Sequence, residues 1–266
     1  MAQSGSALDW GSRGRRFKSS RSDREIKLFF NYGIEFFIIL QDIRLLLIYM
    51  KTAIIIPAYN PPKSFLQLIS TIHTITSSHV IIVDDGSDPL IILASSNCTF
   101  LRNNKNMGKG DALLKGLNYA QKGGFTHAIT LDADNQHDPE YLPLFLECDE
   151  NISIVLGVRN FNSIMPLHRK LSNKLTSQII SWMCNIKILD SQCGYRRYRL
   201  KDVCSKTYSE SGFQFESEVL IKLLRDNYSL KHIAVSTIYS NDNSSMNNFR
   251  DTFKFINLIF RHILKS

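Results

Sequence analysis

From Thr52 onward, the sequence alternates short apolar, β-branched runs with longer stretches of helical periodicity. This alternation is typical of a mostly parallel sheet covered by helices, because parallel strands need a crossover connection that is usually a helix. The runs predicted as strands are 53–56, 80–83, 99–102, 127–131, 152–156 and 232–238. The stretches predicted as helices are 64–76, 109–121, 139–147, 169–184, 215–226 and 249–264. We therefore predict one α/β domain over residues 50–266.

The composition fits one folded domain in a reducing compartment. With 44% hydrophobic and 21% charged residues among 266, the chain has enough apolar side chains for a sizeable core. Its five cysteines, an odd number with no Cys-x-x-Cys pair, argue against a disulfide framework. The net charge of +8 suits a phosphate-bearing ligand or an anionic membrane surface, but it suits an ordinary soluble protein equally well.

Residues 1–49 do not share the alternating pattern. Residues 1–24 are rich in Ser, Gly and Arg, and charges interrupt the apolar stretch 34–50, which disfavours a membrane-spanning helix. Arg16-Phe17-Lys18-Ser19 also resembles the translation of a transfer-RNA gene. We therefore expect residues 1–49 to be disordered or untranslated, with Met50 as the true start. Mass measurement of the native protein checks this expectation, and a start at Met1 would contradict it.

Polar residues follow three of the predicted strands, and ligands bind at the carboxyl ends of strands in such sheets. These residues are Pro57-Ala58-Tyr59-Asn60, Asp84-Asp85-Gly86-Ser87 and Asp132-Ala133-Asp134. Strand alternation would point both carboxylates of the last group to the same side of the chain. Two hard oxygen ligands suit Mg²⁺ or Mn²⁺, with diphosphate oxygens and water completing the shell. An isolated Asp-x-Asp is more often a pair of solvated loop acids, so the surrounding motifs decide.

Two further motifs are ambiguous alone. Asp84-Asp85-Gly86-Ser87 fits a carboxylate that binds a base or ribose, and equally a turn before a helix. The segment 106–112 opens a helix whose free amides and Lys109 would face an anion. It has the spacing of neither a Walker loop nor a dinucleotide fingerprint. The histidines show no metal-ligand spacing, so we expect no zinc site.

Taken in order, the motifs closely resemble glycosyltransferase family 2. They are Pro57-x-Tyr59-Asn60, Val83-Asp84-Asp85-Gly86-Ser87, Asn106-x-Gly108-Lys109-Gly110-x-Ala112 and Leu131-Asp132-Ala133-Asp134-x-Gln136-His137. Gly157-x-Arg159, Arg169, Asp190-Ser191-Gln192-Cys193-Gly194-Tyr195-Arg196 and Phe213-x-Phe215-Glu216-x-Glu218 extend the resemblance to the dolichyl- or polyprenyl-phosphate sugar synthases. The resemblance covers essentially all of residues 52–255. It implies the GT-A fold, with a single Rossmann-like, mostly parallel sheet flanked by helices.

The same resemblance implies roles for individual residues. Pro57, Tyr59, Val83 and Asp85 would hold the nucleoside, and Asp132, Ala133 and Asp134 would lie at the metal and diphosphate. Asp132 and Asp134 would ligate Mg²⁺ or Mn²⁺, Gln136 would touch the sugar or the metal shell, and Lys109 belongs to the same donor site. Arg159, Arg169 and Arg196 would face phosphates. The family usually has Glu where this chain has Pro61, so no contact is carried over there.

The expected reaction moves a hexose with inversion from a UDP- or GDP-hexose to an acceptor. Asp134 with its metal, Arg159 and Arg196 would stabilise the departing diphosphate, and Glu218 is the fourth candidate catalytic residue. A hydroxyl acceptor needs a base, and residues 190–230 contain no Glu-Asp pair for that role. A polyprenyl phosphate is already anionic and is therefore favoured. Glu216 or Glu218 stays open as a base, or as an acid in the first turn of a helix.

Residues 249–264 mix aromatic, aliphatic and basic residues in a helical pattern. This pattern fits a helix on an anionic membrane surface and, equally, a packed C-terminal helix. We expect a cytoplasmic protein, peripheral on the inner face of the membrane, with no nucleic-acid partner. The alternatives are a transferase that acts on a saccharide or glycolipid hydroxyl and a non-catalytic nucleotide-sugar-binding protein. A nucleotidyltransferase is disfavoured, because the first strand lacks a Gly-rich Arg/Lys phosphate loop.

Overall fold

A computed structural model describes residues 51–91, 97–160, 167–237 and 248–263. The side chains of 167–169 and 248–253 are also outside the description. The expectations for residues 1–49 and for the side chain of Arg169 therefore lie outside the described residues.

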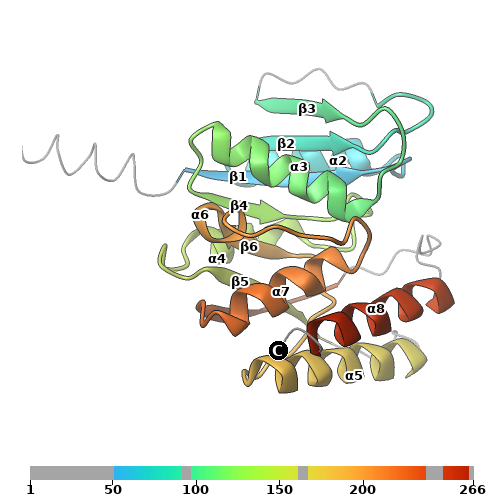
Figure 1. Ribbon diagram of the computed structural model, residues 1–266. Helices are drawn as coiled ribbons and strands as arrows, with labels where there is room; N and C mark the ends of the chain where they lie inside the picture. The colour runs from blue at the N-terminus through green and yellow to red at the C-terminus, as the bar shows by residue number, and fades with distance from the viewer. Residues whose placement is uncertain (1–50, 92–96, 161–166, 238–247, 264–266) are drawn as a thin grey trace, which may run out of the picture. The chain divides into compact units, whose positions relative to one another are not determined.

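The centre of the domain is a seven-stranded sheet with the order β3-β2-β1-β4-β6-β5-β7 (Figure 1). The strands are β1 (Thr52–Ala58), β2 (His79–Asp84), β3 (Cys98–Arg102), β4 (His127–Thr130), β5 (Ile154–Arg159), β6 (Arg196–Arg199) and β7 (Leu230–Val235). All neighbouring strands pair in parallel except β6, which runs antiparallel to both β4 and β5. The prediction of a mostly parallel α/β sheet is confirmed.

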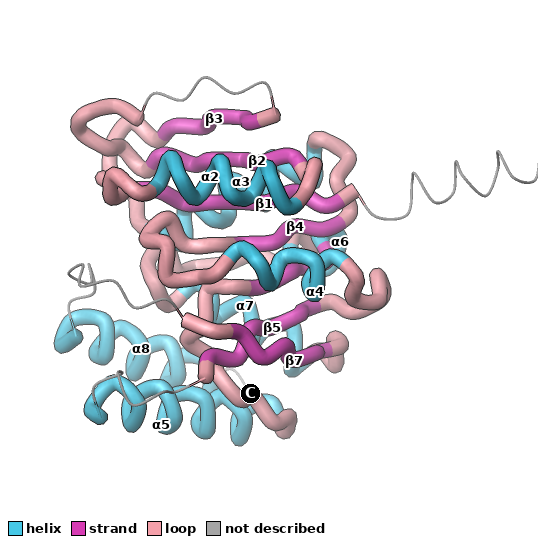
Figure 2. The backbone as a smooth tube through the Cα atoms, turned by 180° about the vertical axis from the view of Figure 1, so that it is seen from behind, coloured by secondary structure: helices cyan, strands magenta, loops and turns pink. Residues whose placement is uncertain are grey.

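The helices are α2 (Phe65–Ile75), α3 (Lys109–Lys122), the short 3₁₀ helix η1 (Pro139–Tyr141), α4 (Leu142–Leu146), α5 (Leu167–Cys184), α6 (Leu200–Val203), α7 (Phe215–Arg225) and α8 (Asn248–Ile263). Figure 1 shows α3 and α7 over one face of the sheet, and the reverse view in Figure 2 shows α2 and α4 over the other. Both views place α5 and α8 next to each other near the β7 end of the sheet.

Burial explains why the expected elements form. Every residue of β1 is buried, which matches its continuous apolar run in a sheet covered on both faces. In α3 the buried side chains include Ala112, Leu113, Leu117 and Ala120, the inward stripe of an amphipathic helix. The start predicted at Asp138-Pro139 is also present, because the Asp138 carboxylate accepts a hydrogen bond from the Glu140 amide at 3.0 Å.

The strand that the sequence did not indicate is β6, with the sequence Arg-Arg-Tyr-Arg. A strand with three arginines has no apolar alternation, yet Arg196 and Arg197 are fully buried within it. Arg197 donates hydrogen bonds to the carbonyls of Cys148 and Asp149 at 2.7 and 2.5 Å, which offsets part of the cost of burying its charge. Its place between β4 and β5 is therefore set by tertiary contacts.

Candidate active site

The end of β2 anchors the loop that leads into α3. The buried Asp85 carboxylate accepts hydrogen bonds from the amides of Met107 and Gly108 at 2.9 and 2.7 Å, and from Asn103 Nδ2 at 2.8 Å. Asp85, predicted to hold a nucleoside, thus also holds the Gly-Lys loop against the sheet. Its oxygens already accept three hydrogen bonds from the protein.

The other predicted nucleoside residues differ in what they can offer to a ligand. Tyr59 follows β1 with half of its surface exposed, whereas Pro57 and Val83 are buried within neighbouring strands. A Cβ added at Gly116 of α3 would lie 3.2 Å from Val83 Cγ2, so this side chain packs against the helix. A contact of Val83 with a nucleoside would therefore be made through its main chain.

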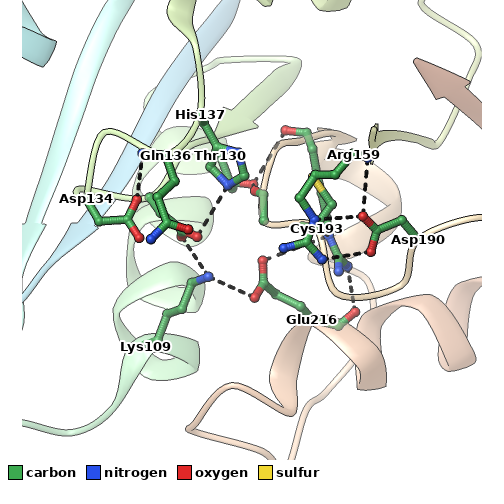
Figure 3. Close-up of polar contacts among 12 residues, drawn as sticks. Lys109, Thr130, Asp134, Gln136, His137, Arg159, Asp190, Cys193 and Glu216 are labelled. Carbon is green, nitrogen blue, oxygen red and sulfur yellow. Dashed lines mark hydrogen bonds and ion pairs between the residues drawn. The ribbon is translucent and has the colours of Figure 1, made fainter. Parts of the chain in front are cut away.

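Lys109 contacts two carboxylates that come from different parts of the chain. Its Nζ lies 2.7 Å from Asp132 Oδ1, beyond β4, and 3.0 Å from Glu216 Oε2, in the first turn of α7 (Figure 3). The two helix starts approach closely at Gly110, where a Cβ would meet Phe215 Cβ at 2.5 Å. Burial disfavours the charged amine, but the charges of Asp132 and Glu216 outweigh this and raise the pKa of Lys109.

The paired aspartates are brought together by a turn. β4 ends at Thr130, so Asp132 and Asp134 lie beyond the strand and are not oriented by strand alternation as the sequence predicted. Instead the Asp134 carboxylate accepts a hydrogen bond from the Gln136 amide at 3.0 Å. Burial and then the negative charge of Asp132 raise the pKa of Asp134, so the two carboxylates are near enough to repel each other.

Asp132 is held on several sides. Burial alone would raise its pKa, but the charge of Lys109 and the hydrogen bond from His137 lower it below the usual range. His137 Nε2 lies 3.4 Å from Asp132 Oδ2, and the ring of His137 is buried beside Tyr195. The backbone of Gly194 closes another side, since a Cβ there would lie 2.8 Å from Asp132 Oδ2. His137 and Gly194 both lie in family motifs, but the motifs alone predicted no role for either residue.

Arg159 ends β5 with its guanidinium fixed. Its Nε and Nη2 donate to the two oxygens of the buried Asp190 at 2.7 and 3.0 Å, a bidentate ion pair. Figure 3 shows this pair across from Glu216. Asp190 is the first residue of the motif at 190–196, but only the tertiary structure shows that it is the partner of Arg159.

Arg196 is not placed as predicted. Its fully buried guanidinium donates to the carbonyls of Cys193, Ser191 and Glu216 at 2.7, 2.8 and 2.7 Å, and to Tyr198 Oη at 3.3 Å. Four donor interactions are thus made inside the protein, and no face of the group is exposed to a ligand. Arg196 ties the start of α7 to β6, which corrects the expectation that it faces a phosphate.

Glu218 is likewise a structural residue. Its fully buried carboxylate accepts hydrogen bonds from the amides of Ser209 and Glu210, each at 2.9 Å, and pairs with Lys222 Nζ at 2.8 Å. Burial would raise the pKa of Glu218, but Lys222 and the amides lower it. Glu216, one turn earlier, is the acid that faces Lys109. Of the two glutamates that the sequence left open as a base, Glu216 thus lies at the site, and Glu218, the candidate catalytic residue, does not.

A divalent metal fits the paired carboxylates on chemical grounds. Burial, and then the negative charge of Asp132, raise the pKa of Asp134, and a bound cation would offset both effects. Carboxylate oxygens are the ligands that Mg²⁺ and Mn²⁺ prefer. No group of three or more His, Cys, Asp or Glu side chains suited to a metal occurs in the described part of the chain. The remaining ligands would therefore come from a diphosphate or from water.

A mostly parallel sheet with paired aspartates beyond a central strand defines the class of GT-A glycosyltransferases. Residues 53–207 match the family described as Glycosyl transferase family 2. The match covers more than half of the chain, and the protein therefore belongs to this family and is a glycosyltransferase. The resemblance seen in the motifs is confirmed.

Two similar proteins have names that refer to lipid phosphates. The UDP-N-acetylglucosamine–dolichyl-phosphate N-acetylglucosaminyltransferase of Methanococcus voltae is 28% identical over 214 residues, which cover 70% of this chain and 85% of that protein. The polyprenol monophosphomannose synthase of Mycolicibacterium smegmatis is 23% identical over 207 residues, with coverage of 70% and 77%.

Solved structures confirm the fold. Mannosyl-3-phosphoglycerate synthase from Rubrobacter xylanophilus superposes with a TM-score of 0.63 at 16% identity, covering 84% of this chain and 75% of that one. Glucosyl-3-phosphoglycerate synthase from Mycobacterium tuberculosis, crystallised with Mn²⁺, UDP and phosphoglyceric acid, has a TM-score of 0.59 at 14% identity and coverage of 81% and 78%.

Proposed function

We propose that this glycosyltransferase moves a hexose with inversion from a UDP- or GDP-hexose to a polyprenyl phosphate, at the cytoplasmic face of a membrane. The observation that carries the proposal is that Arg159, at the end of β5, lies in the same site as Lys109 and the two aspartates beyond β4 (Figure 3). Carboxylates that suit a metal and cations that suit phosphates thus lie at one edge of the sheet.

The contacts of the two candidate bases favour a phosphate acceptor. Glu218, in the first turn of α7, is buried, and its oxygens contact Ser209, Glu210 and Lys222, whereas Glu216 is paired with Lys109. A hydroxyl nucleophile needs a carboxylate that is available to take its proton, whereas a phosphate oxygen already carries charge. The names of the dolichyl- and polyprenyl-phosphate relatives support the same acceptor class.

In the proposed reaction, Asp132 and Asp134 hold Mg²⁺ or Mn²⁺, which when bound neutralises charge on the leaving diphosphate. Asp190 keeps the guanidinium group of Arg159 in one orientation. The Arg159 side chain therefore loses little further conformational entropy when a phosphate binds. Asp85 holds the loop before α3, and this loop sets the position of Lys109. Tyr59 offers an exposed ring to the nucleoside.

The test is a transfer assay with UDP- and GDP-hexoses, with and without Mn²⁺, on a short polyprenyl phosphate and on the matching polyprenol. We expect transfer to the phosphate alone, and NMR of the product should show an inverted anomeric carbon. Asp134→Asn should lower kcat/KM by about 100-fold or more, whereas Asp226→Asn, at an exposed ion pair on the far end of α7, should not. Equal transfer to the polyprenol would favour the hydroxyl alternative. Binding without turnover would favour the non-catalytic one.

The surface of α5 and α8 supports contact with a membrane. On α8, Ile256, Phe260 and Ile263 are exposed at spacings that put them on one face. On α5, Leu171, Leu175 and Trp182 form a similar stripe, with Leu171 and Trp182 70% and 75% exposed. Lys170, Lys174 and Lys187 line a groove beside that stripe. Apolar stripes flanked by lysines are typical of helices that lie on anionic membranes.

No helix in the described ranges has the length and apolarity needed to cross a membrane. The proposed contact is made by the apolar stripes of α5 and α8. Phosphatidylglycerol vesicles should blue-shift the fluorescence of Trp182, measured in a Trp10→Phe background because the chain has two tryptophans. Phosphatidylcholine vesicles should have a weaker effect. An unchanged spectrum with both vesicles would refute the membrane contact of α5.

A further inference from the structure

Lys109 lies between two carboxylates, one of which is a proposed metal ligand. Its Nζ makes its short contact, at 2.7 Å, to Oδ1 of Asp132, one of the two proposed metal ligands. A second contact at 3.0 Å ties the same amine to Glu216. An ammonium has three N–H donors, so two are used by carboxylates and one is left for another acceptor.

The local charges show why the amine lies there. Asp132 and Glu216 both contact Lys109 Nζ. Arg196 Nε is 3.9 Å from Glu216 Oε1, but it donates to the carbonyl of Cys193 at 2.7 Å. Glu216 Oε1 is buried without a hydrogen-bond partner in the described chain. Without a metal, the Lys109 ammonium contacts Asp132 at 2.7 Å, and His137 Nε2 lies farther from the same carboxylate, at 3.4 Å. A divalent ion that binds Asp132 must displace this amine or share the carboxylate with it.

We propose that Lys109 is an internal counter-ion that competes with the divalent metal for Asp132, so that metal binds well only with a nucleoside diphosphate. The inference rests on the proposed donor site and adds an order to its assembly. A diphosphate would offer Lys109 a new anionic partner while Glu216 keeps the amine in place. Asp132 would then be released to the metal.

The experiment measures Mn²⁺ affinity of the full chain without any sugar or acceptor. In calorimetry or by the EPR signal of free Mn²⁺, Lys109→Gln should bind Mn²⁺ about tenfold more tightly than wild type in the absence of nucleotide, because a competing unit charge is gone. Lys122→Gln removes the same charge from the exposed end of α3 and should leave the affinity unchanged. Lys109→Arg keeps the charge and should also stay near wild type.

Two further measurements test the mechanism. Adding Asp132→Asn to Lys109→Gln should abolish the gain, which places the new affinity at Asp132. The coupling between Mn²⁺ and UDP or GDP, measured as the ratio of Mn²⁺ affinities with and without nucleotide, should fall by about tenfold in Lys109→Gln. A residue with a merely structural role would lower both affinities and leave this ratio unchanged.

Unchanged or weaker Mn²⁺ binding in folded Lys109→Gln would overturn the inference. Lys109→Met, which fills a similar space without charge, repeats the test if the glutamine variant does not fold. If wild type binds Mn²⁺ with UDP or GDP but the variants gain nothing without it, the counter-ion role fails and the metal-dependent donor site stands. If Mn²⁺ binds with neither nucleotide, the proposed donor site fails and the inference fails with it.

Discussion

A methyl group added at Gly194 tests the placement of Asp132. The added Cβ would lie 2.8 Å from Asp132 Oδ2, 3.1 Å from Oδ1 and 3.2 Å from Cγ, whereas ordinary contact begins at 3.4 Å. Asp132 must therefore retreat by about 0.6 Å, the difference between 3.4 and 2.8 Å. Lys109 and His137 hold the carboxylate from other sides, so the retreat disturbs their contacts as well.

Gly194→Ala should cost about 1–3 kcal/mol of unfolding free energy, as typical overpacking does, and leave a folded protein. A displacement of this size at a reacting site should weaken Mn²⁺-dependent binding of UDP or GDP by about tenfold or more. Calorimetric titration measures the binding, and urea denaturation measures the stability.

The matched control is Gly123→Ala at the end of α3, where the nearest atoms to an added Cβ are 3.3, 3.4 and 3.5 Å away. It should leave nucleotide binding unchanged. Wild-type affinity and transfer in Gly194→Ala would refute the reasoning, because Asp132 would then not need the position that the structure gives it.

Three further predictions concern buried polar groups. Glu218→Gln removes the charge that Ser209, Glu210 and Lys222 share, so urea denaturation should show a loss of about 2–4 kcal/mol. Nucleotide affinity of the folded variant should not change, and a large loss would restore Glu218 to the active site. Arg196→Lys replaces a fork that bonds three carbonyls, so unfolding should become easier by about 3 kcal/mol; wild-type stability would contradict its structural role. Burial, with the charges of Arg197 and Arg199 adding to it, lowers the pKa of His127 from 6.5 to about 4. The unfolded chain therefore takes up this proton first, and up to about 3 kcal/mol of stability present above pH 6.5 is lost as pH falls toward 4. His127→Gln should show a flatter dependence in that window, and an equal slope would show that other groups cause the loss.

Much of the fold could be predicted from local pattern alone. β1 and β2 are continuous apolar runs that are buried on both faces, and α3 carries an unbroken inward stripe, so periodicity and burial agree. The motif residues after β1, β2 and β4 could be placed at one edge of the sheet, because parallel strands with right-handed crossovers end together. The family also followed from the order of these motifs.

Contacts between distant segments could not be predicted in this way. β6 has no apolar alternation, and Arg197 is buried in it because carbonyls 48 and 49 residues away accept its hydrogen bonds. An arginine at 196 and a glutamate at 218 are residue types that suit phosphate binding and proton transfer. In the tertiary structure, however, their donors and acceptors form hydrogen bonds within the protein. A residue type states which interactions a side chain can make, and burial decides which ones it does make.

The amino-acid sequence by itself determined the α/β class, the family and the edge of the sheet where chemistry would occur, because each depends on local periodicity or on motif order. Only the tertiary structure decided that Lys109 joins Asp132 to Glu216, that Asp190 orients Arg159, and that Gly194 lies against Asp132. Each of these contacts joins residues that are between 23 and 107 positions apart, as the pairs Lys109–Asp132 and Lys109–Glu216 show. Their geometry depends on how helices and strands pack, which no local pattern encodes.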